Sequence, residues 1–202
     1  NAARDLERRN AQGENSDERA DWDVIAKLCI ETLSEYSKDL EVASWLVEAL
    51  LRREGLKGFS TGFTVLSQLV TNYWDVLYPL PDVDDDEMRL GALINLNGAE
   101  YEGTLIRPIY QVAITQGNSV GPFALWQYQQ ALENTKLTNA KAIERRKAEG
   151  SIFLPSIQTA VQETPSAFYA ALQNDLKNAQ DVFAQYNQVM TNCCGSKAPP
   201  QT

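Results

Sequence analysis

The sequence predicts an all-α protein, a helical bundle of about eight to ten helices. Over most of the 202 residues, large apolar side chains recur at intervals of three or four, which is the period of an amphipathic helix. Clusters containing glycine or proline separate these periodic stretches. One short extended segment is expected near residues 105–113, where apolar and polar side chains alternate around Pro108.

The first half of the chain contains the most regular of the expected helices. Ser37 or Asp39 can cap a helix that ends at Gly55, because glycine readily adopts the backbone conformation that terminates helices. Gly62 lies within the next helix, where glycine is unfavourable by about 0.5–1 kcal/mol relative to alanine, so we expect close approach of the preceding helix there. The helices expected in this half are residues 2–11, 21–36, 39–54, 59–78 and 88–96.

The second half is expected to end in the longest helix. Thr164 is its predicted cap and Pro165 its first residue. Apolar residues at positions 168, 172, 176, 179, 183, 186 and 190 form a seam that could pack on a neighbouring helix or on a second copy of the chain, so the fragment is expected to be a monomer or a dimer. The other segments expected to be helical are residues 122–133, the mostly polar 136–149, and the short apolar 151–163.

The domain organisation follows from length and from the end of the last helix. A chain of 202 residues can bury roughly 70% of its unfolded surface, which is enough for one domain without metals or disulfides. We expect one helical domain over residues 1–192. Residues 193–202, which include two adjacent prolines, read as the start of a linker to a C-terminal region absent from this chain.

Charge and cysteine content argue against several classes of partner. The formal net charge is −9, whereas nucleic-acid binding relies on a basic surface, so no nucleic acid is expected. No apolar run approaches the roughly 20 residues of a membrane span, so no direct membrane insertion is expected. Three cysteines, two of them adjacent at Cys193 and Cys194, do not form a disulfide framework and favour a reducing cytoplasm.

The residues needed for most catalytic and metal sites are missing. The chain has no histidine, the commonest general base, and we expect no enzyme activity, no metal and no cofactor. The acidic run 82–87 resembles the start of a calcium-binding loop, but Glu87 and Leu93 occupy positions where such a loop needs glycine and glutamate. Acidic residues that stabilise the start of the following helix are the simpler interpretation. Glu100 and Glu102 would diverge on a helix and form no acid–base pair.

One stretch of about forty residues carries a family resemblance. The segments 37–52 (SKDLEVASWLVEALLR), 54–59 (EGLKGF), 62–63 (GF), 73–75 (YWD) and 78–79 (YP) are similar to the signature of the ImpA N-terminal domain family. Later landmarks are Ala92-Leu93, residues 105–108, Gly121-Pro122 and Thr164-Pro165. The resemblance covers roughly residues 4–192.

The resemblance implies a structural role in bacterial type VI secretion. Members of the family help to assemble the cytoplasmic tail of this machine in Gram-negative bacteria, and they engage baseplate, membrane-complex and tube or sheath proteins. It also implies that the full-length protein is a homo-oligomer formed through its C-terminal region. The family has no established catalytic residues, so the resemblance assigns none here.

The motif residues divide into an apolar and a polar set. The apolar set is expected to form the motif core, with glycines allowing close approach: Trp45, Leu46, Leu50, Gly58, Phe59, Gly62, Phe63, Trp74 and Tyr78. The polar set is expected to serve in capping or ion pairing, or else to face a partner together with the acidic run: Lys38, Asp39, Arg52, Asp75, Asp82, Asp84, Asp85 and Asp86.

A second function is compatible with the same sequence. A helical module of an unrelated complex could bind a small ligand, or act as a regulatory adaptor, with its bundle core as the pocket. A large apolar cavity would favour that function. A filled core together with an exposed patch near the acidic run would favour an assembly module.

Overall fold

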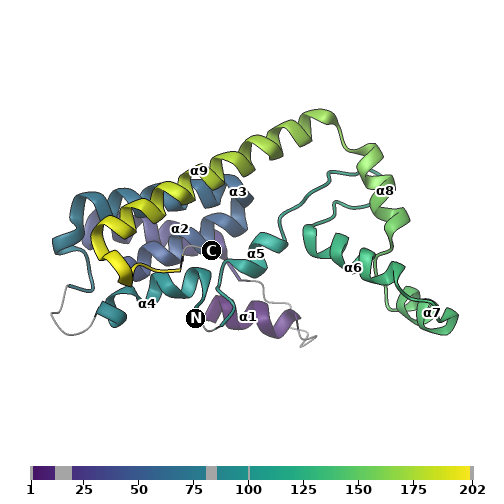
Figure 1. The fold of residues 1–202 in the computed structure, drawn as a ribbon, viewed down its shortest axis with the longest axis horizontal. Helices are drawn as coiled ribbons and strands as arrows, with labels where there is room; N and C mark the ends of the chain where they lie inside the picture. Colours follow the sequence, from purple (N-terminus) through teal and green to yellow (C-terminus); the bar gives the residue numbers. More distant parts are fainter. Residues whose placement is uncertain (1, 12–19, 81–85, 100, 201–202) are drawn as a thin grey trace.

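The chain folds into a helical bundle with a smaller lobe at one end (Figure 1). The computed structural model describes residues 2–11, 20–80, 86–99 and 101–200, and within these residues it contains nine α-helices. The predicted all-α bundle of about eight to ten helices is therefore confirmed. The helices are α1 (Ala2–Ala11), α2 (Trp22–Glu31), α3 (Leu40–Tyr73), α4 (Asp86–Asn97), α5 (Ile106–Tyr110), α6 (Leu125–Thr135), α7 (Ala140–Ala148), α8 (Leu154–Glu163) and α9 (Ser166–Cys194). Short turns extend three of them: the π-helical η1 (Thr32–Tyr36) and the 3₁₀ turns η2 (Trp74–Val76) and η3 (Gly195–Lys197).

Helix α3 is a hairpin of two helical halves that meet at Gly55. Gly55 has φ +60° and ψ −140°, a conformation that glycine adopts without strain. The predicted end of a helix at Gly55 is confirmed. The second half begins directly afterwards, so the expected connection through Gly58 is instead helical. Residues 40–54 and 56–73 therefore run antiparallel with a single residue at the reversal.

Two glycines let the halves of α3 approach closely, as Gly62 predicted. A Cβ atom added to Gly58 would fall on the backbone carbonyl of Leu50. A Cβ atom added to Gly62 would lie 2.9 Å from the Cα atom of Val47, closer than real Cβ contacts allow. The backbones are thus in contact at both glycines, and side chains there would separate the halves.

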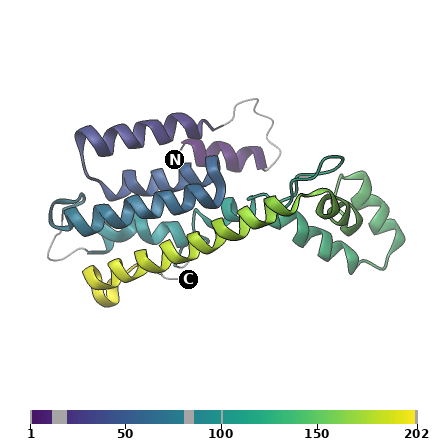
Figure 2. The ribbon, with the colours of Figure 1, turned by 90° about the horizontal axis from the view of Figure 1, so that it is seen from above.

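The main core lies between α3 and the second half of α9, which run side by side in both views (Figure 2). Four aromatic rings form its centre: Phe59, Phe63, Phe183 and Tyr186, with ring centroids 4.5–6.0 Å apart. Leu46 and Leu50 are also buried in this core. The seam predicted on the last helix therefore packs on α3 of the same chain near Ala179, Tyr186 and Met190, whereas Leu176 is exposed.

The expected extended segment near residues 105–113 is wrong. Residues 106–110 form the short helix α5, and the chain makes only one isolated bridge there, from Ala113 to Ala124. Pro108 is the third residue of α5, where an N–H group has no partner within the helix, so proline is tolerated. Leu105 and Pro108 are both buried.

The lobe of residues 114–163 has its own small core, in which Phe123, Ala131, Ile157 and Ala160 are buried. The prediction that Thr164 caps the last helix is wrong, because Pro165 is the N-cap residue of α9. The Thr164 hydroxyl instead accepts the backbone N–H of Gln116 at 2.9 Å and donates to the carbonyl oxygen of Ala160. The Thr164 hydroxyl thus connects the backbone at Gln116 to the end of α8.

Glu163 holds the turn at residues 117–121 against α8. Its carboxylate accepts hydrogen bonds from the Ser119 hydroxyl, from the backbone N–H of Asn118 at 2.7 Å and from that of Ser119 at 2.8 Å. These bonds favour the charged form and lower the Glu163 pKa from 4.5 to about 2.

We expect this clamp to weaken only in acid. Because the folded pKa lies below the unfolded one, the stabilisation is complete above pH 4.5 and is lost as the pH falls towards about 2. An NMR titration of the Glu163 carboxyl carbon should give a midpoint near 2. Protection factors for hydrogen exchange at Asn118 and Ser119 should fall with the same midpoint, and Glu163→Gln should remove that fall. A midpoint near 4.5 would show that the clamp is not formed in solution.

The end of the described chain packs on the bundle. After α9 and η3, Pro199 is buried, and the carbonyl oxygen of Pro200 accepts a hydrogen bond from the Asn97 side chain at 2.8 Å. Pro199 and Pro200 therefore lie against the bundle, and the predicted linker and C-terminal region stay predictions. Among the described helices, none is long and apolar enough to cross a membrane.

Candidate functional site

The two ends of the α3 hairpin meet at one end of the bundle. The Tyr78 N–H donates to the carbonyl oxygen of Lys38 at 2.8 Å, and the Leu40 N–H donates to that of Tyr78, also at 2.8 Å. Tyr78 therefore contributes through its backbone. Its expected place in the motif core is wrong, because half of its side chain is exposed. These two bonds fix the turn after α3 against the segment that precedes it.

Lys38 and Asp39 both cap helices at this junction. The Asp39 carboxylate accepts the N–H groups of Glu41 at 2.8 Å and Val42 at 3.0 Å, which are otherwise unsatisfied at the start of α3. The Lys38 ammonium donates to the carbonyl oxygen of Leu33 at the end of η1 and lies 5.7 Å from the Tyr73 ring centroid. Their side chains are thus engaged within the chain, as the capping interpretation expected.

Replacing Asp39 with alanine should therefore act on stability. Loss of the cap should reduce the free energy of unfolding by about 1 kcal/mol, or about 2–4 °C in melting temperature for a chain of this size. Thermal unfolding followed by circular dichroism measures this, with Asp39→Asn, which can still cap, as the control. Unchanged melting combined with lost partner binding would make Asp39 a docking residue instead.

Arg89 holds the turn from the other side. Its guanidinium carbon lies 3.8 Å from the Trp74 ring centroid, and the guanidinium donates to the carbonyl oxygens of Trp74 and Leu77. The Arg89 side chain is buried and Trp74 is half-buried beneath it. Sequence reasoning missed Arg89; its only signal is an arginine between the apolar residues Met88 and Leu90 of a predicted helix.

Six large apolar or aromatic side chains remain exposed around this held turn. Exposed fractions reach 77% for Tyr36, 60% for Val76 and 73% for Met88. Several exposed large apolar side chains on neighbouring segments commonly mark a protein-binding site. We call this set the bundle-end surface: Tyr36, Tyr73, Val76, Tyr78, Leu80 and Met88.

The predicted acidic residues are only partly placed. Asp75 is exposed within η2, next to Val76 of the bundle-end surface. Asp82, Asp84 and Asp85 lie outside the described residues. Asp86 is the first residue of α4, and its side chain is not described.

Arg52 belongs to a different site, the junction of α1, α2 and α3. Its Nε atom donates to Glu7 at 3.0 Å, its Nη1 atom approaches Glu48 at 3.4 Å, and its guanidinium carbon lies 4.1 Å from the Trp22 ring centroid. Only 10% of the Arg52 side chain is exposed. Arg52 therefore forms ion pairs within the chain, which is the first of the two roles expected for it, and its burial leaves little of it for a partner.

Glu48 is the centre of this network. Its side chain is 1% exposed, and its carboxylate pairs with Arg4 of α1 as well as with Arg52. Glu7 of α1 also accepts the indole N–H of Trp22 at 2.6 Å. We call Arg4, Glu7, Trp22, Glu48 and Arg52 the α1 clasp, since these polar contacts hold α1 on the bundle.

The largest core side chains, among them Phe63, Leu66 and Met190, are fully buried. An apolar groove of about 310 Å³ lies at the edge of this core, between α1, α2 and α3, and the core residue Cys29 forms part of its lining. Its volume is at the lower end of the roughly 300–1,000 Å³ of small-molecule pockets, and it is open to solvent. Two larger open hollows, of about 900 Å³ and 510 Å³, lie beside the α1 clasp and α5. An exposed patch near the acidic run, which is the surface feature expected of an assembly module, is present at the bundle end.

Metal binding and thiol reactivity would depend on how the described residues place their acidic and cysteine side chains. Within them, no three histidine, cysteine, aspartate or glutamate side chains gather as metal ligands would. Burial raises the pKa of Cys29 to about 11, so its thiol is protonated at neutral pH. Burial also raises the pKa of Cys193. These thiols therefore lack the thiolate character of a reactive cysteine.

Comparisons with known proteins agree on one family. Residues 2–98 match the family model described as ImpA, N-terminal, type VI secretion system. The chain is 28% identical over 164 residues to the type VI secretion system component TssA1 of Pseudomonas aeruginosa. The aligned residues make up 81% of this chain and 44% of that protein. This chain therefore spans less than half the length of that curated relative.

A solved structure gives the same assignment for the fold. It is the N-terminal domain, including the conserved ImpA N-terminal region, of the TssA component of the type VI secretion system from Burkholderia cenocepacia. The two superpose with a TM-score of 0.80 and 29% sequence identity, covering 93% of this chain and 73% of that one. The matched region contains both the bundle-end surface and the α1 clasp. The family model, the curated relative and the solved structure therefore all support the ImpA N-terminal family of type VI secretion system components for this chain.

Proposed function

We propose that this chain is a non-enzymatic assembly module of a type VI secretion system, which docks other proteins of the machine through the bundle-end surface. The observation that carries the proposal is a set of exposed large side chains on a turn held by backbone hydrogen bonds and by Arg89. A surface that is already ordered loses little conformational entropy on binding. Its aromatic and methionine content is typical of the centres of protein interfaces.

Charge suggests the chemistry of the partner surface. Between positions 75 and 87 the sequence contains six acidic residues and no lysine or arginine. A partner with an apolar pocket rimmed by basic residues would therefore complement the bundle end. Baseplate, membrane-complex and tube or sheath proteins are the candidate partners, in the cytoplasm of a Gram-negative bacterium.

The rest of the protein would supply multivalency. The curated relative is more than twice as long as the matched region, and we propose that the full-length protein forms a homo-oligomer through a C-terminal region. Several copies of this domain on one assembly would raise avidity even if each contact is weak.

Biolayer interferometry of this domain against the purified baseplate, membrane-complex, tube and sheath proteins of the same organism tests the proposal. Saturable binding to at least one of them at tens of micromolar is expected. Absence of binding to all of them would place recognition in the rest of the protein and would leave this domain as a spacer.

A further inference from the structure

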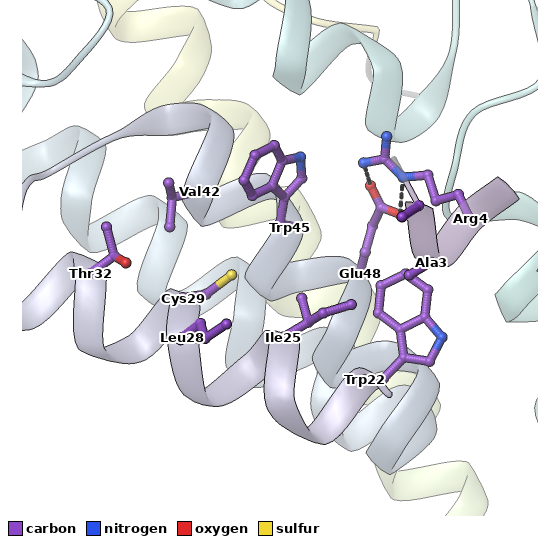
Figure 3. A pocket seen from close by; sticks show the side chains of 11 residues that line it. Ala3, Arg4, Trp22, Ile25, Leu28, Cys29, Thr32, Val42, Trp45 and Glu48 are labelled. Atoms are coloured by element: carbon purple, nitrogen blue, oxygen red, sulfur yellow. Dashed lines mark hydrogen bonds and ion pairs between the residues drawn. The ribbon is translucent and has the colours of Figure 1, made fainter. Parts of the chain in front are cut away.

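The apolar groove lies between α2 and the first half of α3 (Figure 3). Ile25, Leu28, Cys29 and Thr32 line one wall, and Val42 and Trp45 line the other. Ala3 and the Arg4–Glu48 ion pair close one end. The groove is thus an apolar channel that is closed at one end by an ion pair and whose lining includes the core residue Cys29.

The rim of the groove leaves apolar surface uncovered. Val24 is 49% exposed and Leu28 is 55% exposed, and their spacing of four residues places them on the same face of α2. The wall from Ile25 to Thr32 spans seven residues, or roughly 10 Å at about 1.5 Å per residue. That length matches two turns of a docked helix, whose anchors recur at intervals of three or four residues.

Three exposed glutamates surround this apolar surface. Glu31 lies three residues after Leu28 in α2, and Glu41 lies four residues before Trp45 in α3, so each shares a face with a groove residue. Glu35 is exposed in the π-helical η1, which directly continues α2. Among the described residues, none of the three glutamates forms an ion pair. Lys27 lies four residues before Glu31, on the same face of α2, and offsets part of this charge. Three glutamates and one lysine leave the rim net acidic.

We propose that this groove docks an amphipathic helix of a partner protein, with one or two large apolar anchors between the walls and lysine or arginine on the flanks. The apolar walls supply the hydrophobic contact, and the exposed glutamates of the rim select basic flanks over acidic ones. This site is separate from the bundle-end surface, so it would give the domain a second contact with its machine.

A designed peptide pair provides the probe. One synthetic amphipathic helix carries leucine at positions i, i+4 and i+7 with lysine on both flanks, and its counterpart has glutamate in place of every lysine. Isothermal titration calorimetry should show saturable binding of the lysine peptide and binding at least about tenfold weaker for the glutamate peptide. No saturable binding of the lysine peptide would overturn the proposal.

Matched variants separate docking from general attraction to an acidic protein. Leu28→Asp places a charge in the groove, whereas Ile30→Asp places the same charge on the opposite side of α2, where Ile30 is also half-exposed. Leu28→Asp should weaken binding of the lysine peptide by about tenfold or more, and Ile30→Asp should leave its affinity within about twofold of the unsubstituted protein. Equal effects of the two substitutions would refute a groove site. Both residues are exposed, and thermal melting confirms that each variant is folded.

Charge reversal tests the acidic rim. Glu31→Lys combined with Glu35→Lys should shift the preference towards the glutamate peptide. Glu144→Lys combined with Glu149→Lys, which makes the same change in net charge on exposed α7 and its end, should not shift it. Val76→Asp on the bundle-end surface should leave peptide binding unchanged, which distinguishes failure of this site from failure of the proposed function.

Discussion

Replacing Gly58 with alanine is expected to destabilise the protein by about 3 kcal/mol, although alanine is the better helix former. Within a helix, the substitution alone would contribute about 0.5–1 kcal/mol of added stability. At this position the new methyl group would fall on the carbonyl of Leu50. Because that atom belongs to the backbone, relief requires the two halves of α3 to separate and loosens the core between them. Urea unfolding monitored by circular dichroism measures the change.

Gly91 provides the matched control. It lies inside α4, and a Cβ atom added there would meet nothing within 4 Å. Gly91→Ala should therefore stabilise the protein by about 0.5–1 kcal/mol, the ordinary difference in helix propensity. If Gly58→Ala and Gly91→Ala change stability in the same direction, the close contact within the hairpin is not present in solution.

Replacing Glu48 with alanine is expected to reduce the free energy of unfolding by about 3 kcal/mol and to release α1. Removal of one partner from a buried ion pair leaves its counter-charge unpaired, which commonly costs about 3–5 kcal/mol. The Arg52 side chain is 10% exposed, but that of Arg4 is 32% exposed and can be rehydrated, so the lower end of that range applies. Hydrogen exchange of the α1 amides should accelerate together with the loss of stability.

The exposed pair of Arg53 and Asp23 serves as the comparison. Their side chains are 33% and 80% exposed, and exposed ion pairs contribute about 0–1 kcal/mol. Arg53→Ala should thus change stability by less than about 1 kcal/mol and leave α1 protected from exchange. If Glu48→Ala and Arg53→Ala reduced the free energy of unfolding by similar amounts, burial of the α1 clasp would contribute nothing to stability.

Features set by neighbouring residues were predictable from the sequence. The reversal at Gly55 and the cap at Asp39 depend on local backbone conformation, which glycine and aspartate indicate directly. The close approach at Gly62 was inferred from the unfavourable presence of glycine in a helix. Pro108 misled the prediction, because the same residue is compatible with an extended segment and with the first turn of a helix.

Features set by distant residues were not predictable. Arg52 pairs with Glu7, 45 positions away, and Arg89 covers Trp74, 15 positions away, so only the fold brings these side chains together. The bundle-end surface had no sequence signal either. Tyr78 belonged to the predicted apolar face of its helix, yet it is 50% exposed, whereas its neighbour Leu77 is buried. Periodicity identifies apolar residues but not which of them remain uncovered.

The most direct test of the docking function compares two single substitutions in interferometry against whichever component binds the domain. Val76→Asp places a charge in the bundle-end surface, and Tyr101→Asp places the same charge at a residue that is 85% exposed outside it. We expect Val76→Asp to weaken binding by about tenfold or more with unchanged melting, and Tyr101→Asp to have little effect. Binding that survives Val76→Asp and a further Met88→Asp substitution at full strength would contradict a docking role for this surface.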